Sequence, residues 1–157
     1  MFSGLRALPV ANSVFRAETL PEHARGYARD AVTLGWEDRL RARGRRTSDG
    51  GIEFGIALPR GTVLNAGDCL VLDSSRIVVI VIERSEAVFV IAPRTAQQWG
   101  LFAYHIGNNH QPMMIAADGI VCPDVPGMQA LLEQHAIPFS RALRRFTPLG
   151  HVCDHAH

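Results

Sequence analysis

The hydrophobic pattern of the sequence changes near residue 84, and this change constrains the fold more than any other feature. Before it, apolar runs are short, and Gly, Pro, Asn and Asp separate them. Such runs are typical of β-strands, and no convincing helical period appears among them. After it, strand-like runs alternate with two segments of helical period. We therefore expect a small all-β domain at residues 1–84, a mixed domain at residues 85–148, and a flexible tail at residues 149–157.

Within the first domain, the strongest prediction is a β-hairpin over residues 36–58. Apolar and charged residues alternate from Arg39 and again after Ile52, and the turn-rich stretch 44–51 separates the two runs. Cys69 lies in a short apolar run and is expected to be buried as a small hydrophobic side chain. The remaining strands are predicted at residues 14–17, 31–34, 69–72 and 77–83.

The second domain is predicted to have the element order β-α-β-β-α-β, which is the ferredoxin-like pattern. Thr95 can cap a helix that runs to Ile106, because Trp99, Phe102, Ala103 and Ile106 have the spacing of one helical face. Gly107-Asn108-Asn109 is expected to end this helix in a left-handed conformation. The fold class is therefore α+β. The other predicted elements are strands at 87–91, 112–116 and 120–122, a helix at 125–135, and a last strand within 137–146.

The composition favours a soluble cytoplasmic protein. The net charge is only +1, so a nucleic-acid partner is not indicated. The chain has three cysteines, an odd number, and they lie far apart, so a disulfide framework is not indicated either. The longest apolar run, residues 77–82, is far too short to span a bilayer. Residues 1–10 do not resemble a signal peptide.

The only basic cluster lies in the predicted hairpin. Phosphate or nucleic-acid contact is one interpretation, and a solvated hairpin face is the other. The second is favoured, because no aromatic residues alternate with the arginines to form a stacking platform. The cluster consists of Arg39, Arg41, Arg43, Arg45 and Arg46.

Histidine concentrates in two short segments of the last third, which hold five of the seven in the chain. In an extended tail, every second residue projects to the same side. Imidazole and thiolate ligands suit Ni, Cu, Zn or Co, so metal contact is favoured over an accidental His-rich end. The alternating tail residues are His151, Cys153, His155 and His157.

His105 and His110 form the other group. Five residues on a helix correspond to a rotation of about 140°, so these two side chains cannot chelate one ion unless the chain turns after Gly107. His105 is better explained as a packed or hydrogen-bonded residue. His110 lies beyond the helix end in a loop that can expose its ring, and a packed residue and a metal ligand are equally supported there. His23 and His135 have no partner in the sequence and are interpreted as surface residues.

Enzyme signatures are weak throughout, and we do not expect catalytic residues. His151-Val152-Cys153-Asp154-His155 has only a superficial likeness to the ligand run of metallo-β-lactamases, which need further ligands downstream. The sequence also lacks His-Glu-x-x-His, Gly-x-Ser-x-Gly and a phosphate-binding glycine loop. A metal-dependent hydrolase remains one alternative, and a peptide-binding module with incidental metal binding is another.

The segment from Tyr104 to Pro112 resembles the Tyr-His-Leu-Gly-Asn-Arg-His-x-Pro signature of UreE-type urease accessory proteins. Leu58-Pro59-Arg60-Gly61, followed by Gly67-Asp68, is similar to a second element of that family, and the His-containing tail is a third match. The resemblance covers most of the chain from about residue 30. Two departures are Asn109 in place of the usual Arg, and Cys122 as the only soft ligand where some members have extra histidines before the second helix.

This resemblance implies a homodimeric nickel metallochaperone with a peptide-binding-like β domain and a ferredoxin-like metal-binding domain. It implies that His110 is the principal metal ligand and His105 a less certain one, with the tail residues matched by type and place. Ni(II) would be the cargo, and Zn(II) suits the same ligands. Expected partners are urease apoprotein and its accessory complex with a GTPase, and two dimers are expected to be able to pair around one ion.

A mechanism follows from this arrangement. In a two-fold dimer an interface residue meets its own copy, so two His110 imidazoles would form an under-coordinated site that the flexible tails complete. Such a site releases metal more readily than a rigid four-ligand structural zinc site. Imidazole binds metal only when neutral, so affinity should fall as the pH drops through about 6.5.

Overall fold

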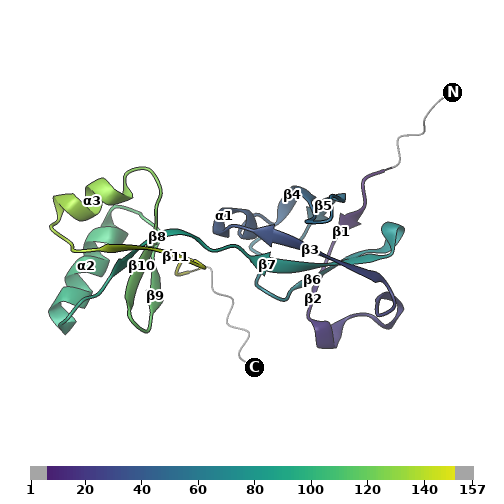
Figure 1. Ribbon diagram of the computed structural model, residues 1–157, viewed down its shortest axis with the longest axis horizontal. Helices are drawn as coiled ribbons and strands as arrows, with labels where there is room; N and C mark the ends of the chain where they lie inside the picture. The colour runs from purple at the N-terminus through teal and green to yellow at the C-terminus, as the bar shows by residue number, and fades with distance from the viewer. Residues whose placement is uncertain (1–6, 151–157) are drawn as a thin grey trace. The chain divides into compact units, whose positions relative to one another are not determined.

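The computed structural model describes residues 7–150, and the chain divides into two compact units, Met1–Glu83 and Arg84–His157 (Figure 1). The predicted tail ligands at residues 151–157 therefore lie outside the described residues. No helix in the described part of the chain is long and apolar enough to cross a membrane.

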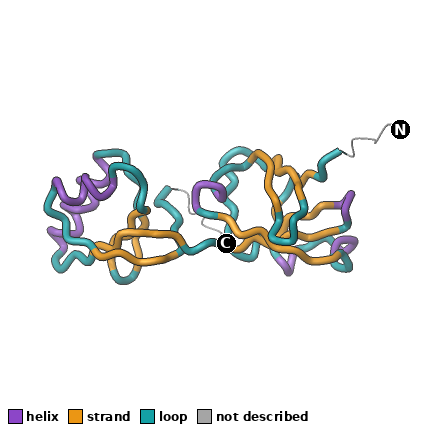
Figure 2. The backbone as a smooth tube through the Cα atoms, turned by 45° about the horizontal axis from the view of Figure 1, so that its top comes forward, coloured by secondary structure: helices purple, strands orange, loops and turns teal. Residues whose placement is uncertain are grey.

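The first unit is built from two small sheets that share one core, and this confirms the predicted β domain (Figure 2). β1 (Val10–Ala11), β5 (Glu53–Ala57) and β4 (Arg43–Thr47) form one sheet in the order β1-β5-β4, with β1 parallel to β5. Side chains from both sheets meet in between, for example Phe54 of the first sheet and Leu70 of the second. The second sheet has the order β2-β6-β7-β3, with strands β2 (Val14–Phe15), β6 (Cys69–Leu72), β7 (Ile77–Glu83) and β3 (Ala28–Leu34).

The predicted hairpin begins later than expected. Residues Trp36–Arg39 form a single helical turn, α1, in which the N–H of Arg39 donates to the carbonyl of Gly35 at 3.1 Å. The paired strands are β4 and β5, so the turn between them is shorter than the predicted loop. The alternation in the sequence begins only at Arg39, the last residue of this turn, and four residues contain too little of either period to distinguish a helix from a strand.

Arg39 is the clearest consequence of this difference. A strand would have placed it on the solvated face, but its side chain is 1% exposed. Its guanidinium donates to the carbonyl of Leu64 at 3.2 Å and lies 3.6 Å from the Glu83 carboxylate. Arg39 is therefore a structural residue of the first unit, and the solvent-exposed part of the basic cluster is smaller than the sequence suggested.

The second unit has the predicted ferredoxin-like order, and its sheet runs β11-β8-β10-β9 with all neighbours antiparallel. One face of this sheet carries Phe89 opposite Cys122, and Ile91 opposite Ile120. These four residues pack against both helices, so the helices cover the same face. The elements are β8 (Glu86–Ile91), α2 (Ala96–Asn108), β9 (Met114–Ala116), β10 (Gly119–Pro123), α3 (Met128–Gln134) and β11 (Ser140–Arg144).

Helix α2 begins as the sequence predicts and ends slightly later. The Thr95 hydroxyl accepts a hydrogen bond from the N–H of Gln98 at 3.1 Å, which is an N-cap contact. The helix continues through Gly107 to Asn108. Helix α3 is shorter than expected, since it begins at Met128 after Gly127, whose φ is +89°. A left-handed residue cannot lie inside a right-handed helix, so the helix begins after it.

Candidate metal centre

His110 is the second residue beyond the end of α2 and directly follows the C-cap residue Asn109. Its N–H donates to the carbonyl of Gly107 at 2.9 Å, and the N–H of Gln111 donates to the carbonyl of Ile106 at 3.2 Å. These two hydrogen bonds define a Schellman motif, which satisfies carbonyls at the end of the helix. Because Ile106 is fully buried, the motif ties the His110 backbone to the core of the second unit.

The backbone of His110 is left-handed, with φ at +55°. Glycine is the residue that usually fills this position, because a side chain there costs about 1 kcal/mol. The sequence predicted that Gly107 or the following asparagines would be left-handed, and that prediction was wrong. The chain thus holds an imidazole where a glycine would be more stable, which is typical of a residue retained for function.

The imidazole of His110 is available for a ligand. The residue is exposed, and within residues 7–150 its side chain has no hydrogen bond, ion pair or ring contact. Its backbone, in contrast, is held by the helix end. A fixed backbone with an unengaged imidazole is a suitable donor for a borderline metal ion such as Ni(II) or Zn(II).

His105 has a different environment. Its ring stacks on that of His135, with centroids 3.9 Å apart and planes at 15°, and both residues are half-buried. Metal lies in the plane of a coordinating imidazole, and two nearly parallel planes do not meet near the rings. His105 and His135 therefore cannot share one ion in this arrangement. No motif in the sequence indicated this contact. The prediction that His135 is a surface residue without a partner was wrong, because it is half-buried and stacked on His105.

His23 lies in the first unit, and its interpretation as a surface residue agrees with the structure. Its Nε2 is 3.0 Å from a carboxylate oxygen of Asp73, and the hydroxyl of Tyr27 donates to the same oxygen at 3.0 Å. The side chains of His23 and Asp73 are both mostly exposed.

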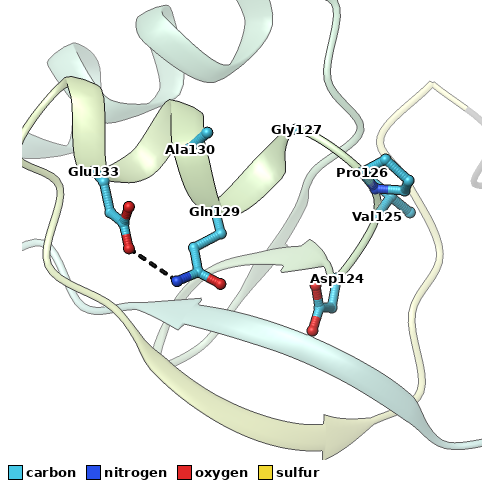
Figure 3. A pocket seen from close by; sticks show the side chains of 7 residues that line it. All are labelled: Asp124, Val125, Pro126, Gly127, Gln129, Ala130 and Glu133. Atoms are coloured by element: carbon cyan, nitrogen blue, oxygen red, sulfur yellow. Dashed lines mark hydrogen bonds between the residues drawn. The ribbon is translucent and has the colours of Figure 1, made fainter.

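Cys122, the soft ligand nearest the second helix, is unsuitable for metal. It is fully buried on the helix-covered face of the sheet, and burial raises the pKa of its thiol to about 12. A thiol binds metal as the thiolate, which this environment strongly disfavours. The nearby acidic side chains are already engaged with protein partners. Asp124 and Glu133 line a hollow of about 580 Å³. Glu133 accepts a hydrogen bond from Gln129 there (Figure 3), and Asp124 forms an ion pair with Arg141 at 2.9 Å.

The described part of the tail lies beside the loop that follows His110. The N–H of Leu149 donates to the carbonyl of Met113 at 2.8 Å. Met113 is three residues after His110 in the sequence. Across residues 7–150, no group of three or more His, Cys, Asp or Glu side chains is placed to hold a metal ion. Within this range, His110 is therefore a single donor, and a complete site needs further ligands.

Comparison with known proteins identifies the family. The model of the UreE urease accessory protein N-terminal domain matches residues 13–83, and that of the C-terminal domain matches residues 86–157. The chain belongs to the UreE family. A urease accessory protein UreE of Acetivibrio thermocellus is 32% identical over 82% of this chain and 86% of its own length. Counterparts in Paraburkholderia xenovorans and Burkholderia mallei are 35% and 32% identical, over 74% and 88% of this chain.

The match covers only part of those last two UreE proteins, since this chain spans 52% and 66% of their lengths. Both UreE domain models nevertheless fall on the two compact units of the structure, with their boundary near residue 84.

The contact between Leu149 and Met113 has no signal in the sequence, because it joins residues far apart in the chain through backbone atoms alone.

Proposed function

We propose that this chain is a nickel-binding metallochaperone that delivers Ni(II) to urease apoprotein during assembly of the urease active site. The observation that carries the proposal is His110, an exposed imidazole on a backbone that the end of α2 fixes in a left-handed conformation, which favours glycine. Membership of the UreE family supplies the context of urease maturation. The chain acts as a carrier in this proposal and has no catalytic residues.

The tail supplies the remaining ligands. Residues His151, Cys153, His155 and His157 follow directly after Gly150, and Leu149 is hydrogen-bonded to Met113. An extended chain spans at most about 3.3–3.6 Å per residue. Seven tail residues can therefore reach roughly 25 Å from this anchor. The loop from His110 to Met113 is much shorter, so ligands of the tail can reach the imidazole of His110 in the same chain.

A homodimer would supply a second copy of His110. Large apolar side chains are exposed on the second unit, including Leu101 and Tyr104 of α2 at 48% and 61%. Exposed apolar side chains near a functional residue favour a protein contact, and a two-fold axis would bring identical surfaces together. Two His110 imidazoles and donors from two tails would then complete the coordination of one ion. Two such dimers could also bind one ion between them in the same way.

The mixed character of this site explains how cargo is released. The two imidazoles hold the ion on fixed backbones, while the tail donors can leave one at a time to a receiving site. Urease apoprotein and its accessory complex, including a GTPase, are the proposed receivers. Zn(II) prefers the same donors, so it is expected to compete for the site.

Equilibrium dialysis with Ni²⁺ tests the proposal on four proteins: the wild type, His110→Ala, a chain ending at Gly150, and His23→Ala as a matched control. Ending at Gly150 keeps the hydrogen bond between Leu149 and Met113. We expect His110→Ala to lower the Ni²⁺ affinity about 100-fold or more. Mutating residues that only hydrogen-bond to a metal ligand already lowers metal affinity by about 10–100-fold. The truncated chain should bind fewer ions or bind them more weakly, and His23→Ala should match the wild type.

Unchanged stoichiometry and affinity in both His110→Ala and the truncated chain would refute the metal-carrier role. Urease activation that survives the loss of His110 and all four tail ligands would instead support an interaction module in which metal is incidental. Turnover of an ester, amide or phosphate substrate that stops on chelation would support a hydrolase.

A further inference from the structure

Within residues 7–150, strand β4 is an edge strand of the three-stranded sheet, and the phase of its hydrogen bonds shows which residues face outward. On one side of the hairpin the N–H of Leu58 donates to the carbonyl of Ala42, and on the other the N–H of Ser48 donates to that of Ile52. Hydrogen-bonded pairs in an antiparallel ladder alternate with non-bonded pairs. Even-numbered residues of β4 therefore bond to β5, and odd-numbered residues direct their backbone groups to the free edge.

Gly55 supports this phase independently. It lies opposite Arg45 in the register, and its N–H donates to the carbonyl of Pro9 on the other side of β5. The pair of Arg45 and Gly55 is thus non-bonded, as the alternation requires. The backbone N–H groups of Arg43, Arg45 and Thr47 consequently point away from the sheet.

The side chains on the same outward residues are basic. Arg43 and Arg45 are exposed and lie on the face opposite the core, because their neighbour Gly44 pairs with buried Ile56. Arg41 precedes them and is 65% exposed, with a distant 3.8 Å contact to Asp38. The edge therefore combines outward backbone groups of β4 with a row of guanidinium groups two residues apart.

Arg46 differs from these arginines. Its guanidinium folds back to donate to the carbonyl of Arg45 at 2.8 Å and to that of Asp38 at 3.0 Å. It braces the start of β4 against α1. The carbonyl of Arg45 faces the edge and is engaged by this contact. The outward N–H groups of Arg43, Arg45 and Thr47 and the carbonyls of Arg43 and Thr47 have no partner within residues 7–150, so these groups can pair with another strand.

We propose that the edge of β4 docks an extended, acidic segment of a partner protein, which adds to the sheet as a fourth strand. Backbone hydrogen bonds to residues 43–47 would fix the register. Acidic side chains at alternate positions would lie opposite Arg43 and Arg45, where cross-strand pairs of opposite charge are stabilising. A nucleic acid fits less well, because the outward positions of β4 and β5 are Arg43, Arg45, Thr47, Glu53, Gly55 and Ala57, with no aromatic ring for stacking.

Binding of a fluorescein-labelled peptide with alternating Glu and Thr residues tests the proposal by anisotropy with the full-length protein. Arg43→Glu/Arg45→Glu is expected to weaken binding at least about tenfold, which corresponds to about 1.4 kcal/mol. Arg25→Glu/Arg60→Glu is the matched control, since it changes the net charge equally at exposed residues outside β4. This control and the wild type should bind alike, and a Lys-Thr peptide should not bind.

Thr47→Pro separates strand addition from simple charge attraction. It removes an outward N–H without changing the charge, and proline is tolerated where the N–H faces solvent. We expect Thr47→Pro to lower the affinity for the peptide about tenfold while the midpoint of protein unfolding stays unchanged. Hydrogen exchange of the Arg43 and Thr47 amides should slow when the wild type binds the peptide.

Three results would overturn the proposal. Absence of peptide binding would indicate that the arginines only protect the edge from self-association. Equal losses in the two charge-reversal variants, with none in Thr47→Pro, would indicate non-specific attraction. Binding of single-stranded RNA that depends on Arg43 and Arg45, without peptide binding, would assign the surface to nucleic acid.

Discussion

His110 and His105 belong to the same short motif, yet the fold gives them opposite environments. His110 is exposed on a left-handed backbone, and within residues 7–150 its imidazole has no partner. His105 is half-buried and stacked on His135, while Cys122, the other candidate near the second helix, is sealed in the core. The comparison shows that donor type alone does not make a ligand, because packing decides which donors a metal can reach.

The largest expected effect concerns the support of His110. Ile106→Ala should destabilise the second unit by about 2–5 kcal/mol, because Ile106 is fully buried and its loss leaves a cavity next to the Schellman motif. Urea unfolding measures this change. A loss below about 1 kcal/mol would contradict the view that the core fixes the His110 backbone.

His110→Gly separates stability from function. We expect Ni²⁺ affinity to fall about 100-fold or more, as for any lost ligand, while stability rises by about 1 kcal/mol because glycine accepts the left-handed conformation. Calorimetric titration and thermal unfolding measure the two quantities on the same protein. Asn109→Gly is the neighbouring control, since Asn109 has φ at −92° and gains nothing from glycine. A destabilised His110→Gly protein would disprove the strain at this residue.

Cys122 provides a prediction for alkaline pH. Burial raises the pKa of its thiol from 9.0 to about 12, so the unfolded chain loses this proton at a lower pH than the folded one. The contribution of Cys122 to stability is therefore complete below about pH 9 and falls between about pH 9 and 12, by at most about 1.4 kcal/mol per pH unit. Urea unfolding at several alkaline pH values should show a flatter dependence for Cys122→Ala, and equal slopes would indicate an accessible thiol.

The smallest effect should come from the stacked pair. A double-mutant cycle with His105→Ala and His135→Ala is expected to give a coupling of about 0.5–1.5 kcal/mol in stability, the range for aromatic pairs. Neither substitution should change Ni²⁺ affinity by more than about threefold, well within 1 kcal/mol. A loss of affinity in His105→Ala comparable to that in His110→Gly would place both histidines in the metal site and break the contrast between them.

Much of the fold was predictable because its signals are local. The capping residue Thr95 and the helical spacing through Ile106 located α2, and the strand pattern after residue 84 predicted the ferredoxin-like order. The turn at Trp36–Arg39 was missed, since four residues show no distinct period and the contacts of Arg39 lie at Leu64 and Glu83. The candidate ligand His110 was also found from its motif, but its left-handed backbone was assigned to the wrong residue.

The sequence by itself determined the α+β class, the family and the donor types available to a metal ion, because these depend on periodicity, motifs and composition. Only the tertiary structure decided that the His110 imidazole is unengaged within residues 7–150, that His105 stacks on His135, and that Cys122 is buried. The physical reason is that exposure and stacking depend on contacts between residues distant in the chain. The anchoring of Leu149 at Met113 is another such contact, and it places the start of the tail beside the loop that carries His110.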